Sequence, residues 1–203
     1  MNIIKKCYCY VRDVYIKKRY IGRRFRKSYG SFGEHSCIHR PFIYDNNRKL
    51  IHIGKETTIL EHSRIQLYPE RVNQTPHIYI GDGCYIGYYF SILAGADVRI
   101  GNHVLVASHV LISSENHGIN PESEIEYMEQ PLTGASVVIE DGCWIGENVC
   151  ILPGVTIGKK SIIGSGSVVT KSVPPYCIAA GNPARIIKKY NFTSHQWEKC
   201  DVT

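Results

Sequence analysis

Aliphatic residues recur at every sixth position through most of the middle of the chain. From Ile139 the sequence reads IEDGCW, IGENVC, ILPGVT, IGKKSI, IGSGSV and VTKSVP, and similar series begin at Ile80 and Ile53. A small or branched residue usually occupies the fifth position, and glycine often occupies the second. A period of six fits neither an α-helix nor the simple alternation of a strand. The pattern therefore predicts a solenoid of very short strands joined by tight corners, with the aliphatic residues stacked inside.

This pattern divides the chain into three parts. We expect a basic N-terminal segment at residues 1–50, the solenoid at residues 51–174, and an exit loop with a C-terminal tail at residues 175–203. Two prolines, Pro174 and Pro175, end the last repeat. We predict that the final residues, NFTSHQWEKCDVT, form a short helix.

Charge is concentrated at the N-terminus. The formal net charge of the chain is +6, but residues 1–27 carry +9 and the remainder carries −3. This segment mixes apolar and basic residues and predicts a short amphipathic helix. Such a helix fits either a cap on the open edge of the solenoid or contact with an anionic membrane surface. Since the segment has no apolar signal-peptide core, we expect a cytoplasmic protein, with peripheral membrane association as the alternative.

The chain has eight cysteines, but their spacing does not match a zinc site. Cys84, Cys143 and Cys150 lie inside the apolar hexads. We therefore interpret the cysteines as reduced thiols that pack as small hydrophobic residues, and we expect no bound metal.

The six-residue pattern stops between Ser113 and Ser136, where the sequence turns polar and contains His117 within ENHG. Functional residues concentrate on loops that project from a rigid scaffold. Imidazole is also the side chain best suited to act as a general base near neutral pH. The interruption therefore indicates a projecting catalytic loop.

The hexads over about residues 51–190, the ENHG segment and the C-terminal run IGSGSVVTKSVPPYCIAAGNPARIIKKY resemble the hexapeptide-repeat acetyltransferases. Within that family the chain is most similar to sugar and polysaccharide O-acetyltransferases of the maltose and galactoside type. The resemblance implies an all-β fold, a left-handed parallel β-helix with three hexads per coil. It also implies a homotrimer with active sites between neighbouring subunits.

The same resemblance implies the chemistry. His117, preceded by Asn116, would be the general base that deprotonates the acceptor, which attacks acetyl-CoA directly. Trp144 would line the site, and the backbone amide of Glu147 would stabilise the oxyanion. The residues implied in binding acetyl-CoA are Ser165, Thr170, Lys171, Ala180, Gly181, Asn182, Pro183, Arg185 and Lys188.

The implied acceptor is a hydroxyl of a sugar in a capsule, an O-antigen or a precursor of these glycans. Where several sugar acetyltransferases carry an asparagine facing the acceptor, this chain has Tyr88 and Tyr89, which we expect to contact the carbohydrate. We expect no nucleic-acid partner. The glycine-rich run GSGSVV also lacks the strand–glycine–helix context of a Walker or dinucleotide-binding motif.

Two other enzyme classes fit parts of the sequence. An antibiotic-inactivating acetyltransferase would share the loop histidine and the C-terminal run. A γ-type carbonic anhydrase would share the fold and bind zinc through three histidines. His103 and His109 are six residues apart, which we interpret as stacking on successive coils, and His117 would be the third ligand.

Overall fold

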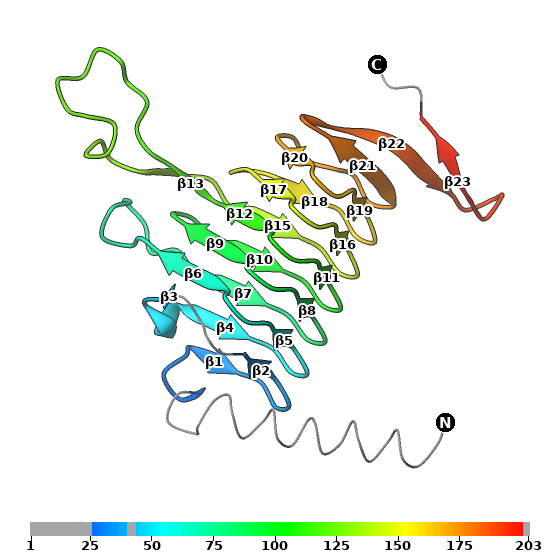
Figure 1. The fold of residues 1–203 in the computed structure, drawn as a ribbon, viewed down its shortest axis with the longest axis horizontal. Coiled ribbons are helices and arrows are strands. Elements are labelled where there is room, and N and C mark those ends of the chain that lie inside the picture. The colour runs from blue at the N-terminus through cyan, green and yellow to red at the C-terminus, as the bar shows by residue number, and fades with distance from the viewer. Residues whose placement is uncertain (1–25, 40–43, 201–203) are drawn as a thin grey trace.

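The computed structural model describes residues 26–39 and 44–200. Strands β1 to β20, leaving out β13 and β14, wind into stacked triangular coils, and each coil contributes one short strand to each of three parallel sheets (Figure 1). The hexads predict this solenoid, and it is the all-β, left-handed parallel β-helix that the family resemblance implies. The N-terminal helix expected within residues 1–27 falls almost entirely outside the described residues.

The three sheets form the faces of the β-helix. Face 1 contains β1 (Ser31–Phe32), β4 (Ile51–Ile53), β7 (Ile78–Ile80), β10 (Val98–Ile100), β15 (Val137–Ile139) and β18 (Thr156–Ile157). Face 2 contains β2 (Cys37–Ile38), β5 (Thr58–Ile59), β8 (Tyr85–Ile86), β11 (Leu105–Val106), β16 (Trp144–Ile145) and β19 (Ile162–Ile163), and it continues into the C-terminal strands. Face 3 contains β3 (Tyr44–Asp45), β6 (Arg64–Leu67), β9 (Ser91–Ala94), β12 (Leu111–Ser113), β17 (Cys150–Ile151) and β20 (Val168–Val169).

The first and fifth positions of the hexads form the core. In the hexad that begins at Ile145, both Ile145 and Val149 are buried, and Ile145 pairs in parallel register with Val106 of the preceding coil. The second and third positions turn the corner, and residues with positive φ follow them, as at Gly142 (φ 67°). Burial of aliphatic side chains and the parallel backbone ladder therefore stabilise the same coil geometry.

The hexad pattern places the start of the β-helix at residue 51. In the structure the β-helix begins one coil earlier. Strands β1, β2 and β3 pair with β4, β5 and β6 and form a first coil, preceding a single 3-10 turn, η1 (Arg48–Leu50). The sequence hides this coil because only one six-residue spacing, from Phe32 to Ile38, precedes Pro41.

The prediction of a C-terminal helix for the last residues is wrong. The exit segment forms β21 (Cys177–Gly181), which pairs with β19, and then an antiparallel hairpin of β22 (Ala184–Asn191) and β23 (Gln196–Lys199). We call residues 177–199 the C-terminal hairpin. Its strands extend face 2, because the last coil exposes backbone groups that another strand can pair.

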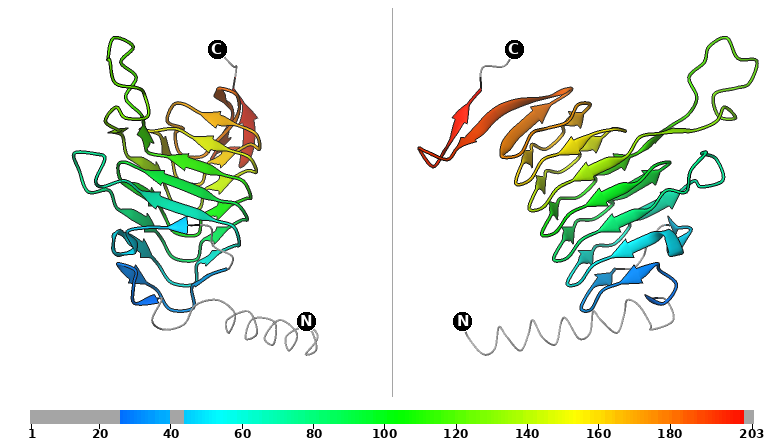
Figure 2. Two further views of the ribbon diagram at one scale, coloured as in Figure 1. Left: turned by 60° about the vertical axis from the view of Figure 1, so that its left-hand side comes forward. Right: turned by 180° about the vertical axis from the view of Figure 1, so that it is seen from behind.

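Two long excursions leave the corner between face 3 and face 1. Residues 68–77 connect β6 to β7, and residues 114–136 connect β12 to β15. We call the second excursion the arm. Both project from the same side of the β-helix (Figure 2). Gly95, on the coil between them, has no room for a side chain, because a Cβ there would lie 2.6 Å from the Glu115 Cβ.

The described cysteines, Cys37, Cys84, Cys143, Cys150, Cys177 and Cys200, are all free thiols. Burial raises the pKa of the Cys143 thiol to about 11. Over the described ranges, no helix has the length and apolar character needed to cross a membrane.

Candidate active site

The arm is an ordered projection with its own short antiparallel base. Strands β13 (Glu115–Asn116) and β14 (Thr133–Gly134) pair where the arm leaves the coils. His117 follows β13 directly, and its side chain is exposed. Its Nδ1 lies 3.0 Å from the carbonyl oxygen of Tyr127, on the returning side of the arm.

This contact fixes the proton on the imidazole of His117. A carbonyl oxygen only accepts hydrogen bonds, so the bond requires Nδ1–H as the donor and leaves Nε2 with a free lone pair. An exposed imidazole held in this tautomer can accept a proton from a hydroxyl group through Nε2. The sequence could not indicate Tyr127, because the contact uses a backbone atom that every residue possesses.

Trp144 lies on the outside of face 2 and is 50% exposed. Tyr85 and Leu105 precede it in register on the preceding coils, and Ile162, Ile178 and Lys188 follow it toward the C-terminal hairpin. We call these six residues the outer row. They form an apolar track that ends in a cation.

Glu147 does not have the free amide predicted for an oxyanion donor. Its N–H donates to Ser165 Oγ of the next coil at 3.2 Å. Its carboxylate lies 3.5 Å from the Nδ1 of His109. The amide of this corner therefore turns toward the hydroxyl that the following coil supplies.

Tyr88 and Tyr89 occupy the corner between faces 2 and 3, and both are half-exposed. The ring of Tyr89 stacks between His62 and His109, with centroids 4.7 and 4.9 Å away. Both faces of Tyr89 are therefore covered by imidazoles, whereas no ring among the described residues stacks on Tyr88. Of the two tyrosines, only Tyr88 could stack on the face of a sugar ring.

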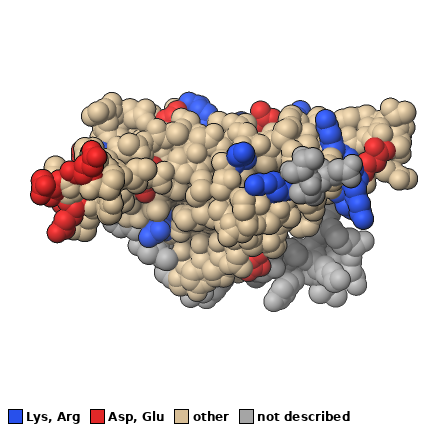
Figure 3. Space-filling view, turned by 90° about the horizontal axis from the view of Figure 1, so that it is seen from above, with Lys and Arg blue, Asp and Glu red and all other residues tan. Residues whose placement is uncertain are grey.

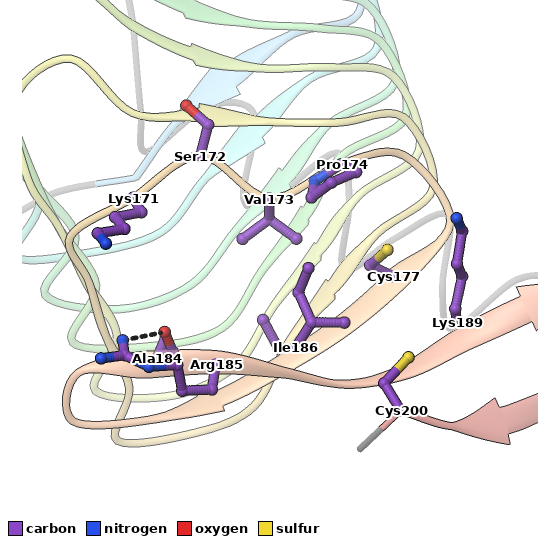
Figure 4. A pocket seen from close by; sticks show the side chains of 11 residues that line it. Lys171, Ser172, Val173, Pro174, Cys177, Ala184, Arg185, Ile186, Lys189 and Cys200 are labelled. Carbon is purple, nitrogen blue, oxygen red and sulfur yellow. Dashed lines mark hydrogen bonds between the residues drawn. The ribbon is translucent and has the colours of Figure 1, made fainter. Parts of the chain in front are cut away.

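A pocket of about 540 Å³ lies between the last coil and the C-terminal hairpin (Figure 4). Its apolar floor includes Val173, Ala179 and Ile186. Lys171 and Arg185 lie at one side of the pocket, and Lys189 lies at the other. The pocket thus combines an apolar surface with cations, which suits an anionic ligand with an apolar part.

The hairpin pocket is lined by Lys189, whereas the sequence indicated Lys188. The register pairs Lys189 with the buried Cys177 and Lys188 with Ile178, so the two lysines lie on opposite sides of β22. A register shift between Ile178 and Ala179 sets this phase. Such a shift cannot be read from the sequence alone.

The other residues predicted to bind acetyl-CoA lie on the last coil and the turn of the hairpin. Thr170 is exposed beside Lys171, and Ala180 packs over Gly164, where an added Cβ would lie 2.9 Å from the Ala180 Cβ. The turn between β21 and β22 exposes Gly181 (φ 108°), Asn182 and Pro183.

A single chain does not bring the arm to these residues. The arm extends from one side of the β-helix, and the C-terminal hairpin lies on the opposite side in each view (Figures 1 and 2). The arm carries five glutamates and neither lysine nor arginine. Figure 3 shows acidic side chains gathered at the arm end and basic side chains toward the hairpin.

The interpretation of His103 and His109 as neighbours on successive coils is wrong. His103 lies at the corner between faces 1 and 2, and His109 lies at the next corner, between faces 2 and 3. Six residues span one face, whereas a full coil needs three hexads. Among residues 26–39 and 44–200, no group of three or more His, Cys, Asp or Glu is arranged to hold a metal ion.

Comparison with known proteins identifies a family with this fold and related proteins. Residues 136–171 match the family described as "Bacterial transferase hexapeptide (six repeats)". Galactoside O-acetyltransferase of Escherichia coli K12 is 40% identical over 117 residues, which cover 57% of this chain and 55% of the relative. The E. coli K12 protein named "Putative lipopolysaccharide biosynthesis O-acetyl transferase WbbJ" is 39% identical over 128 residues, covering 60% and 65% of the two chains. The chain thus spans between half and two thirds of the length of these curated relatives.

A solved structure covers more of the chain. The crystal structure of the hexapeptide-repeat containing acetyltransferase VCA0836 of Vibrio cholerae is 30% identical to this chain. The match covers 82% of this chain and 77% of the VCA0836 chain, with a TM-score of 0.58. A second crystal structure of VCA0836 is a complex with acetyl coenzyme A, at 29% identity and a TM-score of 0.57.

Proposed function

The chain belongs to the hexapeptide-repeat acetyltransferase family, and on that premise we propose that it is an acetyl-CoA-dependent sugar O-acetyltransferase. Its acceptor is a hydroxyl group of a sugar in a cell-surface glycan or in a precursor of such a glycan. Galactoside O-acetyltransferase and WbbJ, which is named for lipopolysaccharide biosynthesis, are the relatives that support this acceptor class.

The observation that carries the proposal is the hydrogen bond between His117 Nδ1 and the Tyr127 carbonyl. With Nδ1 protonated, His117 Nε2 removes the proton of the acceptor hydroxyl as the hydroxyl oxygen attacks the thioester carbonyl. The tetrahedral intermediate then expels the thiolate of CoA, which takes the proton back from the imidazolium. The product is an O-acetyl ester and free CoA, with no covalent acyl-enzyme.

Binding of acetyl-CoA is assigned to the outer row and the hairpin. Trp144 contacts the thioester end, and the apolar side chains of Ile162 and Ile178 follow the pantetheine arm. Lys188 ends the row and, with Lys171 and Arg185 beside the hairpin pocket, provides cations for the phosphates. Ser165, Thr170, Ala180 and the exposed turn at residues 181–183 border this path.

The acceptor is placed between His117, Asn116 and the exposed ring of Tyr88. Asn116 lies on β13 directly before His117, and its exposed side chain can bond a sugar hydroxyl. Tyr89 is omitted from this group because its ring faces are covered by His62 and His109.

The active form is a homotrimer in which the arm of one subunit completes the site of its neighbour. Two observations support this assembly. The arm and the C-terminal hairpin lie on opposite sides of one chain, and the arm exposes large apolar side chains: Ile119, Ile125, Tyr127 and Met128. Exposed apolar side chains grouped on a projecting segment are typical of a surface that another chain covers.

The proposal is tested with labelled acetyl-CoA and a panel of glycan acceptors, with chloramphenicol and a streptogramin as counter-substrates. We expect transfer to a sugar hydroxyl and a loss of about two to four orders of magnitude in kcat for His117→Ala. Acetyl-CoA binding by calorimetry and the thermal midpoint of the variant should match the wild type.

Three results would overturn the proposal. Transfer to an antibiotic in preference to every glycan would identify a xenobiotic acetyltransferase. Stoichiometric zinc whose removal abolishes activity would indicate a metal hydratase. A His117→Ala variant with the wild-type rate would remove the base from the mechanism.

A further inference from the structure

The arm holds His117 at a distance from the coils, so other contacts must fix the position of His117. The polar contacts within the arm converge on the side chain of Gln130. This side chain is only 4% exposed, although it lies on a projecting segment. Its Oε1 accepts a hydrogen bond from the Asn120 N–H at 3.0 Å. Its Nε2 donates to the carbonyl oxygens of Asn120 at 3.1 Å and Ile125 at 3.0 Å.

These bonds tie Asn120 and Ile125, which follow His117 in the sequence, to the returning segment of the arm at Gln130. Gln130 also packs against the residue that follows His117, because a Cβ added to Gly118 would lie 2.7 Å from the Gln130 Cβ. Its own N–H donates to the carbonyl oxygen of Glu126, the residue before Tyr127. A buried amide with its donors and acceptor paired holds the surrounding backbone in one arrangement.

A second contact joins the arm to the coils. Arg71, on the excursion at residues 68–77, donates from Nη2 to the Met128 carbonyl oxygen at 2.6 Å, and its own carbonyl accepts from the Leu132 N–H at 3.3 Å. The excursion is itself anchored, because Gln74 donates from Nε2 to the Gly95 carbonyl oxygen at 3.1 Å. The carbonyl that Arg71 holds is adjacent in sequence to the Tyr127 carbonyl that orients His117.

We propose that Gln130 and Arg71 are positioning residues for His117. Gln130 fixes the arm from within, and Arg71 braces residues 127–128 against the excursion at residues 68–77, so that the Tyr127 carbonyl meets the imidazole. Neither side chain contacts the substrate; both act through His117. This inference rests on the proposed function, because it requires His117 to be the base.

The test uses variants that remove hydrogen bonds while keeping volume. Arg71→Met keeps the aliphatic stem of the side chain, and Gln130→Met keeps its length. Misplacing a catalytic group by about 1 Å can cost about 100-fold in rate. We therefore expect kcat to fall between about 10-fold and 100-fold in each variant, while the KM for acetyl-CoA stays within about twofold.

A rescue variant and a neighbouring control sharpen the result. Arg71→Lys keeps a cationic donor and should retain kcat within about threefold of the wild type. Glu70→Gln changes the exposed neighbouring residue and should leave both constants unchanged.

The double variant Arg71→Met/His117→Ala separates positioning from general stability. If Arg71 acts through His117, adding Arg71→Met to His117→Ala should cause no further loss of rate. The same fold-loss in both backgrounds would overturn the proposal, as would a wild-type kcat in Arg71→Met and Gln130→Met. The proposed function would survive either result, because His117→Ala would still be inactive. Wild-type activity of His117→Ala would instead remove both.

If Arg71→Met fails to fold, the comparison is made with Gln130→Met and Gln130→Glu. Gln130→Glu removes the two Nε2 donations without changing the shape of the side chain. Equal kcat in Gln130→Glu and the wild type would then contradict the proposal.

Discussion

The arm and the C-terminal hairpin both leave the regular β-helix, yet they are built in different ways. The hairpin continues face 2, so its conformation is set by backbone ladders from β19 through β23. The arm pairs only at its base, through β13 and β14, and beyond that its shape depends on a few contacts made by side chains. A segment of the second kind can hold one imidazole in place without adding to the core.

The two regions also differ in charge. The arm contains five glutamates and neither lysine nor arginine, whereas the hairpin and the adjoining last coil carry Lys171, Arg185, Lys188, Lys189 and Lys199. Cations favour the phosphates of a nucleotide co-substrate. The difference predicts that changes in the hairpin act on the KM for acetyl-CoA, and that changes in the arm act on kcat.

The largest expected effect on the hairpin side comes from Lys171 and Arg185. Hydrogen bonds to charged groups contribute about 1.5–3 kcal/mol, so Lys171→Met and Arg185→Met should each raise the KM for acetyl-CoA about 10-fold or more. The kcat at saturating acetyl-CoA should stay within about twofold.

Initial-rate kinetics and calorimetric titration with acetyl-CoA measure both quantities. Lys55→Met, on an exposed corner far along the β-helix, is the matched control and should change neither. A fall in kcat with unchanged KM in the Lys171 and Arg185 variants would contradict the division between hairpin and arm.

The β-helix was predictable because its signal repeats. Each hexad states the same rule, so Ile139, Ile145 and Ile151 reinforce one another, and one irregular hexad does not hide the pattern. The first coil was hidden because it offers a single spacing, from Phe32 to Ile38. The C-terminal hairpin was mistaken for a helix because its strand character comes from the open edge of face 2, which is a property of the fold.

Prediction of the site depended on which atoms take part. Side chains that differ from their surroundings, such as His117 and Trp144, can be identified from the sequence. The Tyr127 carbonyl that orients His117 and the Ser165 hydroxyl that occupies the Glu147 amide cannot, because both contacts depend on how distant segments meet. The placement of Lys189 on the pocket side depended on a register shift within the hairpin.

A smaller effect is expected from the aromatic cluster that stiffens the hairpin. Trp197 lies opposite Tyr190, with ring centroids 5.3 Å apart at 71°, and Phe192 contacts both Tyr190 and Tyr176 edge-on. Aromatic pairs of this geometry contribute about 0.5–1.5 kcal/mol beyond their buried area. Trp197→Ala should therefore raise the KM for acetyl-CoA only about threefold.

Hydrogen exchange locates this effect. Amides of residues 184–200 should exchange faster in Trp197→Ala, and amides of the arm should exchange at the wild-type rate. Faster exchange in both regions would show that the hairpin and the arm are coupled within one subunit and are not independent structures.

The smallest effect concerns the coils, which belong to neither region. On face 1, His52 stacks on Tyr79 with centroids 4.7 Å apart, and its Nε2 lies 3.4 Å from the Nδ1 of His77. Burial, and then the nearby His77, lower the pKa of His52 below its ordinary value. The unfolded chain therefore binds a proton at His52 more readily than the folded protein does, so the stability contributed by His52 is present above pH 6.5 and declines as the pH falls below it.

Replacing His52 with glutamine should remove this contribution without affecting catalysis. The free energy of unfolding of His52→Gln should fall less steeply than that of the wild type between about pH 6.5 and pH 5, measured by urea denaturation. Because His52 lies far along the β-helix from the hairpin, both kcat and the KM for acetyl-CoA should be unchanged. If the free energy of unfolding depends on pH equally in the two proteins, then folding does not change the pKa of His52. A change in kcat would show that face 1 helps to position the arm. The coils would then contribute to that positioning together with Gln130 and Arg71.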